Sequence, residues 1–199
     1  FIVETRSGER VVIDNVQLKL FLEKEGFFKF YQDKSETPIF INIDENIVRN
    51  CSATKIKDFV LNYLFERNEL QVWNYLASTT KYFTDIYLSF LESIELQMMK
   101  DAKDTVYLYF QNGVVEVKKD SHKLLDFMDC EGYVWEDQII KREYKKTDND
   151  SNDFKKFVHR ISADETKRIQ TMESTLGYLM SSHKDKTDQK SIIFNDQEI

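Results

Sequence analysis

Apolar and polar residues alternate most clearly over residues 104–119, DTVYLYFQNGVVEVKK, and this pattern predicts a β-hairpin. Its two apolar runs, Val106–Phe110 and Val114–Val117, are rich in β-branched and aromatic residues, which pack well on a pleated sheet. Asn112 and Gly113 separate the runs. Asn-Gly favours a type I′ turn, because that turn needs positive φ at both central residues. We therefore expect these two residues at the tip of the hairpin.

The first part of the chain is predicted to form a short hairpin followed by a helix. The strand-like segments FIVET and RVVID, within residues 1–15, flank a Ser-Gly pair. Asn15 is a favoured N-cap and Gly26 a favoured C-terminal stop, so the helix is expected to run to Glu25. Its apolar face would contain Leu18, Phe21 and Leu22.

A second hairpin is predicted where residues 27–31 and 38–43 alternate around a polar loop, with residues 47–50 extending it. Residues 52–65 then carry apolar side chains at the i, i+3, i+4, i+7 spacing of an amphipathic helix. The order helix, hairpin, helix over residues 15–65 suggests a winged-helix-like unit.

Two shorter helices and a further irregular region are expected before the C-terminal part. Glu69–Tyr82 is predicted to be a helix with inward-facing Leu70, Trp73, Leu76 and Ala77, and Thr84–Phe90 a shorter helix. Residues 124–130 and 133–135 are expected to form strand or irregular structure around a turn at Gly132.

The C-terminal part is predicted to be helical. Residues 145–153, KKTDNDSND, are polar and lack periodicity, so we expect a linker, followed by a short helix over 154–160. Ser162 and Glu165 fit a capping box, which would open a helix reaching about Ser182. The inward face of that helix would hold Ile169, Met172, Leu176, Leu179 and Met180. A short strand, Ser191–Phe194, is expected after a second polar linker.

These elements predict an α+β fold of helices and short antiparallel hairpins with a helical C-terminal segment. We expect a mixed domain over residues 1–146 with a sub-boundary near residue 90, and a helical segment over residues 151–184. Residues 190–199 would be the first strand of a further domain.

Composition excludes several classes of protein. The chain of 199 residues is 41% hydrophobic and contains 15 Phe, which excludes a disordered chain. Its net charge of −7 excludes a uniformly basic nucleic-acid-binding coat. Cys51 and Cys130 form neither a disulfide framework nor a zinc motif, so we expect two reduced, partly buried thiols in a cytoplasmic protein. No segment resembles a signal peptide or membrane span, and the chain begins at Phe1, so we expect a piece of a longer protein.

Basic residues concentrate locally despite the acidic total. Residues 141–168 contain nine basic and six acidic residues, with Tyr144, Phe154 and Phe157 interleaved. Lysine and arginine neutralise phosphates, and aromatic rings stack on bases. The candidate nucleic-acid-binding residues are therefore Lys141, Arg142, Lys145, Lys146, Lys155, Lys156, Arg160, Lys167 and Arg168. The alternative is an ordinary solvated surface with Phe154 and Phe157 in the core.

A metal-dependent nuclease is a second hypothesis. Asp104, followed across the hairpin by Glu116 and Lys118, imitates a PD-(D/E)xK pattern, in which carboxylates hold a divalent cation and lysine positions water. The same alternation also fits a half-solvated strand. Asp44 and Glu45 fit a polar turn better than a metal site, and the three histidines lack partners at zinc spacing.

Four short segments in the later part of the chain share a pattern with one group of proteins. They are YFQNGVVEV (109–117), GYVWEDQII (132–140), TLGYLMSSHK (175–184) and KSIIFND (190–196). The last two are similar to a helix with a Leu-Gly-Tyr-Leu pattern and the first strand of a superfamily 3 helicase domain. Together the segments resemble the region before the ATPase core of phage and plasmid primase-helicases, including Bacteroides-type mobile-element primases. The resemblance spans roughly residues 50–199.

The resemblance implies a non-catalytic accessory region that engages DNA and supports assembly of a downstream motor. The chain contains no G-x-x-x-x-G-K-[ST], the loop that binds nucleotide phosphates, and ends just before its expected place. We therefore expect no ATP hydrolysis and no cofactor in this part of the protein. The implied partners are single-stranded or forked DNA, further copies of the chain and the helicase domain, with no membrane partner.

Overall fold

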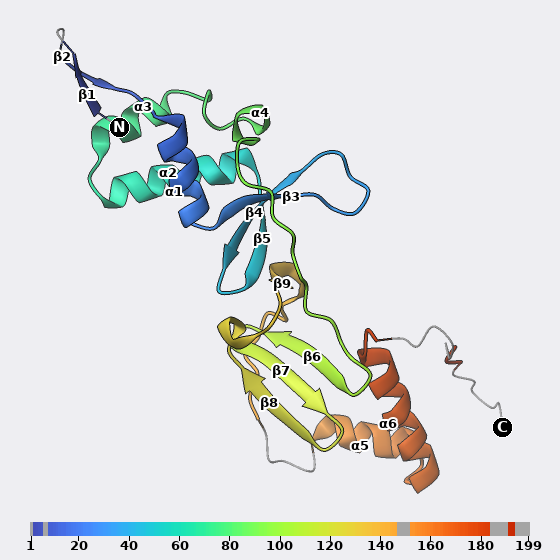
Figure 1. The fold of residues 1–199 in the computed structure, drawn as a ribbon. Coiled ribbons are helices and arrows are strands. Elements are labelled where there is room, and N and C mark those ends of the chain that lie inside the picture. Colours follow the sequence, from blue (N-terminus) through green and yellow to red (C-terminus); the bar gives the residue numbers. More distant parts are fainter. Residues whose placement is uncertain (1, 6–7, 147–151, 184–190, 194–199) are drawn as a thin grey trace. The chain divides into compact units, whose positions relative to one another are not determined.

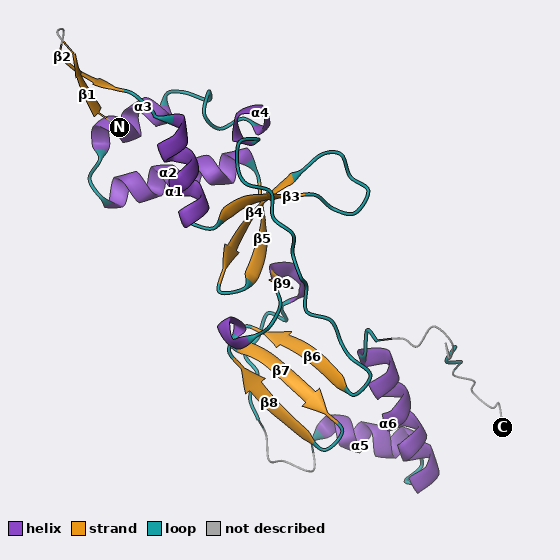
Figure 2. Cartoon of the chain, viewed as in Figure 1, coloured by secondary structure: helices purple, strands orange, loops and turns teal. Residues whose placement is uncertain are grey.

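The computed structural model describes residues 2–5, 8–146, 152–183 and 191–193 (Figure 1). Helices and strands are both abundant in these residues, so the predicted α+β class is confirmed (Figure 2). The chain divides into two compact units. The first comprises Phe1–Met98 with Glu131–Gln138, and the second comprises Met99–Cys130 with Ile139–Ile199. The predicted division into 1–146, 151–184 and 190–199 stays a prediction.

The first unit contains three longer helices, a four-stranded sheet and a separate hairpin. Its elements are β1 (Ile2–Thr5), β2 (Gly8–Val11), α1 (Asn15–Lys24), β3 (Phe27–Phe30), β4 (Ile39–Asp44), β5 (Ile47–Cys51), α2 (Ala53–Glu66), α3 (Leu70–Ala77), α4 (Asp85–Leu88), β9 (Val134–Trp135) and the 3₁₀ helix η2 (Glu136–Gln138). The sheet order is β3-β4-β5-β9, antiparallel except for the parallel β5–β9 pair. Both predicted hairpins are thus confirmed, whereas the winged-helix-like arrangement stays a prediction.

One apolar core unites the helices of the first unit with its sheet. Leu18 and Leu22 on α1, and Ile56 and Val60 on α2, are buried with Phe27 of β3. Further buried members of this core are Ile13, Phe40, Leu64, Val72, Leu76, Tyr82, Phe83, Leu88 and Leu91. The predicted inward faces of α1 and α2 are therefore confirmed.

Three predicted details of the first unit are wrong. The N-cap of α1 is Asp14 rather than Asn15, because the Asp14 carboxylate accepts a hydrogen bond of 2.9 Å from the Gln17 amide. The helix predicted to reach Tyr82 ends at Ala77. Leu70, predicted to face inward, is exposed, and Val72 is buried in its place.

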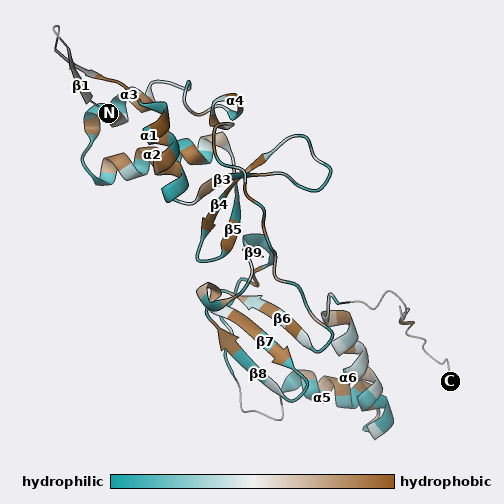
Figure 3. Cartoon of the chain, viewed as in Figure 1, coloured by the Kyte–Doolittle hydropathy of each residue, from teal (hydrophilic) through white to brown (hydrophobic). Residues whose placement is uncertain are grey.

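The second unit combines a three-stranded antiparallel sheet with two helices. Its elements are β6 (Thr105–Phe110), β7 (Gly113–Lys118), β8 (Ser121–Leu125), the 3₁₀ helix η1 (Phe127–Asp129), α5 (Asp153–Ile161) and α6 (Thr166–Met180). β7 is hydrophobic along much of its length (Figure 3), and Val114 and Val115 within it are buried. Asp101 ties the end of α6 to β6, since its carboxylate accepts from the Tyr107 amide and from the amide and hydroxyl of Ser182.

The predicted β6–β7 hairpin is confirmed, but its turn is different. Phe110 pairs with Gly113, so Gln111 and Asn112 form the two-residue tip. Gly113 is the first residue of β7 and has φ of +138°. A Cβ at this position would overlap the carbonyl oxygen of Leu125, so glycine is required by close packing against β8.

The predicted capping box between α5 and α6 is wrong. Ser162 is buried and is the C-terminal cap of α5, and its amide makes the last helical hydrogen bond, to the Val158 carbonyl at 3.1 Å. Ala163 and Asp164 follow with positive φ, and α6 begins after Glu165, whose side chain makes no capping hydrogen bond. Leu179 and Met180, predicted to face inward, are exposed.

The remaining predictions for the second unit have mixed outcomes. The short helix after the linker is confirmed as α5, whereas residues 147–151 of the linker lie outside the described residues. Residues 191–193 are not a strand, and Phe194 of the predicted strand also lies outside the described residues. None of the helices in the described part of the chain has the length and hydrophobicity of a membrane span.

Candidate nucleic-acid interface

All nine basic residues of the candidate site belong to the second unit, and every one of them is exposed. They lie on two parts of that unit. Lys141, Arg142, Lys145 and Lys146 follow the 3₁₀ helix η2 in an irregular segment, whereas Lys155, Lys156 and Arg160 lie on α5 and Lys167 and Arg168 on α6.

Backbone hydrogen bonds hold the first basic segment against the β6–β7 hairpin. The Ile140 amide donates to the Tyr109 carbonyl at 2.9 Å, and the Gln111 amide donates to the Arg142 carbonyl at 3.1 Å. The Asn112 side chain then holds both backbone groups of Tyr144: its oxygen accepts at 2.8 Å and its amide nitrogen donates at 3.0 Å. The end of the hairpin therefore anchors residues 140–144, which include Lys141 and Arg142.

Tyr144 occupies a half-buried position on the hairpin. Its ring centroid lies 5.4 Å from that of Phe110 and 6.1 Å from that of His122. The Arg142 guanidinium carbon lies 5.8 Å from the centroid of Phe110, within cation–π range. Tyr144 is thus used mainly in packing, and the base-stacking role suggested for it is less favoured than for the phenylalanines of α5.

On α5, the aromatic residues lie on the surface. Asn152 caps the helix, because its side-chain oxygen accepts from the Lys155 amide at 2.8 Å. The inward contact of α5 is made by Val158, which is buried. Phe154 and Phe157 are 60% and 55% exposed, so their placement in the core, which was the alternative interpretation, is wrong.

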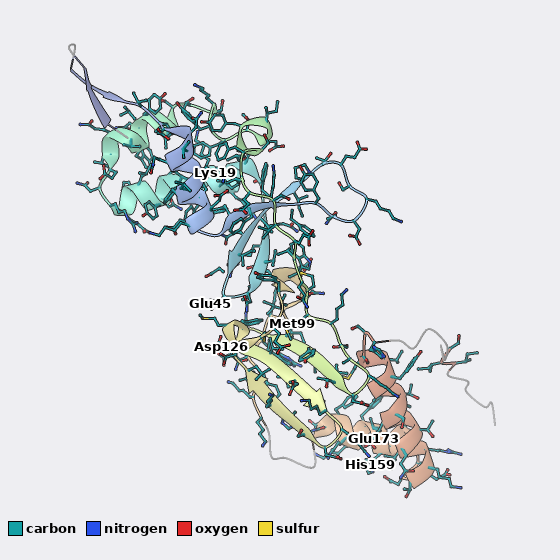
Figure 4. All side chains as sticks on the ribbon, in the orientation of Figure 1. Lys19, Glu45, Met99, Asp126, His159 and Glu173 are labelled. Atoms are coloured by element: carbon teal, nitrogen blue, oxygen red, sulfur yellow. The ribbon has the colours of Figure 1, made fainter. Side chains whose placement is uncertain are left out.

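On α5 and α6, Lys156 and Arg168 form exposed ion pairs. The Lys156 ammonium lies 3.2 Å from the Asp153 carboxylate. The Arg168 Nε atom lies 2.8 Å from the Glu165 carboxylate. Figure 4 labels His159 on α5, whose ring nitrogen lies 3.2 Å from Asp164. Exposed pairs of this kind contribute about 0–1 kcal/mol, so an incoming phosphate can displace the carboxylates at little cost.

The glutamate of the nuclease hypothesis is paired with two lysines of the sheet. Glu116 lies 3.1 Å from the Lys118 ammonium and 3.3 Å from that of Lys123. Lys118, with a smaller contribution from Lys123, lowers the pKa of the Glu116 carboxyl against the opposing effect of its burial. Asp104 lies in the turn before β6, outside this ion-paired group. The geometry favours a structural ion-pair role for Glu116.

The other candidate metal ligands have structural roles in the described residues. Asp44 ends β4 and forms a 3.2 Å ion pair with Arg49. Glu45 and Asn46 both have positive φ, so they form the β4–β5 turn as the polar-turn interpretation predicts. Within the described ranges, no three His, Cys, Asp or Glu side chains gather closely enough to hold a metal ion.

The two cysteines are partly buried and are not joined by a disulfide, as predicted. Burial raises the pKa of both the Cys51 and the Cys130 thiol, so neither is activated as a nucleophile.

Two features of this surface were missed by sequence reasoning. The clamp from Asn112 to Tyr144 joins residues 32 positions apart, and nothing local in the sequence indicates that partner. Ile161 is 48% exposed and continues the apolar stripe of Phe154 and Phe157 along α5. The i, i+3, i+7 spacing of these three residues was a usable signal, but it predicts a buried face as readily as an exposed one.

Comparison with known proteins adds no family assignment. The chain matches no protein-family model, and no curated protein matches it.

Proposed function

We propose that this chain is a non-catalytic accessory region of a DNA-replication primase-helicase, which engages DNA and supports assembly of a downstream ATPase motor. The DNA-contacting surface is formed by the exposed basic residues of the second unit, chiefly those of α5. Its partners are single-stranded or forked DNA, further copies of the chain and the helicase domain, and it acts in the cytoplasm.

One observation carries the DNA part of this proposal. α5 exposes two phenylalanines on the same nine-residue helix as Lys155, Lys156 and Arg160. The combination matters, because cationic and aromatic groups together bind both the phosphates and the bases of DNA. The sequence resemblance to primase-helicases supports the same class of partner.

The test is fluorescence anisotropy of labelled single-stranded and forked DNA against the whole chain, from low to high salt. We expect the affinity to fall steeply with salt, because binding cations releases counterions from DNA. Replacing Lys155, Lys156 and Arg160 together by alanine should weaken binding and reduce the slope of log K against log salt by about 0.7 for each of these residues that contacts a phosphate of a single strand.

The matched control removes three exposed lysines of the first unit, Lys24, Lys34 and Lys55. It changes the net charge equally and should leave the affinity within about twofold. Equal losses in the two variants would mean that only total charge matters. Absence of binding at low salt, with the wild-type chain folded, would refute the DNA-binding role and leave assembly as the remaining part of the proposal.

A further inference from the structure

We propose that the ligand of this surface is an unpaired strand whose bases stack on Phe154 and Phe157 while its phosphates follow Lys156 and Arg160. This inference rests on the proposed DNA-binding function and goes further, because it commits to single-stranded DNA and assigns a separate task to each side chain.

The two phenyl rings are arranged as a stacking platform. Their centroids lie 6.4 Å apart with planes 33° from parallel, and more than half of each side chain is exposed. Both side chains are therefore open to the bases of a bound strand. In a duplex the faces of the bases are covered by the neighbouring base pairs, so an unpaired strand is the form that can stack on both rings.

The cations flank the rings on one side only. Each residue of an α-helix turns by about 100°, which places Arg160 about 60° from Phe157 and Lys156 about 40° beyond Arg160. Lys155 projects on the opposite side, about 160° from Phe157. Val158 and Ser162, which are buried, lie between Phe154 and Lys155 around the helix. A strand stacked on the rings can therefore reach Lys156 and Arg160 but is separated from Lys155 by the packed side of α5.

Charge complementarity selects this occupant over a second copy of the chain. A second copy docked through the same stripe would place Lys156 and Arg160 close to the same two cations of its neighbour, and like charges repel. An exposed apolar stripe bordered by Lys156 and Arg160 suits a polyanion with apolar faces, and single-stranded DNA has both properties.

The first experiment separates stacking from charge. Labelled oligothymidylate and a hairpin duplex of equal length are titrated with wild type and with the double variant Phe154→Ala/Phe157→Ala. We expect the double variant to bind oligothymidylate at least about tenfold more weakly, with an unchanged salt slope. Phe65→Ala, which removes a 66% exposed phenylalanine from α2, is the matched control and should bind as wild type does.

The second experiment tests the assignment of the cations. The double variant Lys156→Ala/Arg160→Ala should reduce the salt slope by about 1.4, whereas Lys155→Ala should leave it unchanged. In a further variant, Phe157→Trp, we expect oligothymidylate to quench the fluorescence of the new tryptophan and the duplex to leave it unchanged. Circular dichroism of every variant establishes that it is folded.

The outcomes distinguish this inference from the proposed function. Loss of affinity in the lysine and arginine variants with none in the phenylalanine variants would refute stacking and leave the DNA-binding role intact. Equal affinity for the duplex would also refute it. If sedimentation velocity instead showed a wild-type oligomer that the phenylalanine variants dissociate, with DNA binding unchanged, the stripe would be a protein interface. Absence of binding to any DNA would refute both proposals.

Discussion

In the first unit, α1 and α2 turn their apolar faces into a shared core; in the second, α5 leaves most of its apolar face in water. Leu18 and Leu22 on α1 are at most 2% exposed, whereas Phe154 and Phe157 on α5 are more than half exposed. Burying a leucine or phenylalanine fully contributes about 1.5–3 kcal/mol. Most of that stabilisation is absent at the phenylalanines of α5.

The comparison teaches that an amphipathic pattern specifies an apolar face but not what covers it. In the first unit, the sheet and neighbouring helices are at hand to cover α1 and α2. α5 has one buried apolar residue, Val158. The helix packs with α6, in which every residue is at least partly exposed. The apolar residues of α5 therefore stabilise the fold less and remain available to a ligand.

The largest expected effect contrasts the two helices directly. Leu22→Ala removes a fully buried side chain and should destabilise the protein by about 2–5 kcal/mol, because it leaves a cavity. Phe157→Ala removes a larger side chain but should cost less than about 1 kcal/mol, because most of it is already in water. Urea denaturation, with amide hydrogen exchange to assign the unit that opens, measures both.

Leu20→Ala is the matched control for this contrast, since Leu20 lies on the same helix and is 53% exposed. It should cost well under half as much as Leu22→Ala. A loss from Phe157→Ala as large as that from Leu22→Ala would show that α5 is packed more tightly than its exposure indicates, and that the two helices do not differ in this respect.

Two glycines of the second unit provide a smaller and opposite pair of effects. Gly113→Ala should destabilise the protein by about 1–3 kcal/mol, because residue 113 has φ of +138° and its new Cβ would meet the Leu125 carbonyl. Gly177→Ala should stabilise it by about 0.5–1 kcal/mol, since that glycine is inside α6 with nothing within 4 Å of a new Cβ. Thermal unfolding measures both.

The sign of the Gly177 result tests how loosely α6 is covered. A destabilising Gly177→Ala would mean that another part of the protein packs against α6 at this position. Gly113 and Gly177 would then both lie at closely packed positions, and the two substitutions would no longer differ in sign.

Patterns in the sequence predicted the helices and strands well where residues close together in the sequence determine the structure. The helical spacing of Leu18 and Leu22, and of Ile56 and Val60, identified the inward faces of α1 and α2, because a buried face must repeat every turn. The alternation on either side of the β6–β7 turn likewise located both strands.

The failures arose where distant residues decide a local choice. Asn112-Gly113 is the stronger sequence signal for a type I′ turn. The turn with positive φ at both central residues, however, is the β4–β5 turn at Glu45 and Asn46. Gly113 is used for its close approach to β8, and Asn112 for its hydrogen bonds to Tyr144. Ser162 has the sequence of a capping residue but is buried at the end of α5. Of the candidate site, the basic positions followed from sequence, whereas the exposure of Phe154 and Phe157 depends on what lies beside α5.

The smallest expected effect concerns Glu116, whose carboxylate is paired with two lysines on the sheet of the second unit. Because Lys118 lowers the pKa of this carboxyl from its ordinary value of 4.5, the ionised form is favoured in the folded state. The stabilisation is therefore present above about pH 4.5 and is lost as the pH falls through the lowered pKa. Both lysines are at least half exposed, so the contribution should be only about 0.2–1 kcal/mol.

Glu116→Gln should accordingly lower the melting temperature slightly at pH 7, and the difference from wild type should vanish towards pH 2.5 and shrink in high salt. Glu173→Gln, the same change at an exposed position on α6, is the matched control and should leave the melting temperature at pH 7 unchanged. A difference that persists at pH 2.5 would mean that Glu116 stabilises the sheet by packing rather than by charge. If wild type cleaved DNA in Mg²⁺ and Glu116→Gln did not, the carboxylate would instead be a metal ligand, and the second unit would be a nuclease rather than a platform for DNA.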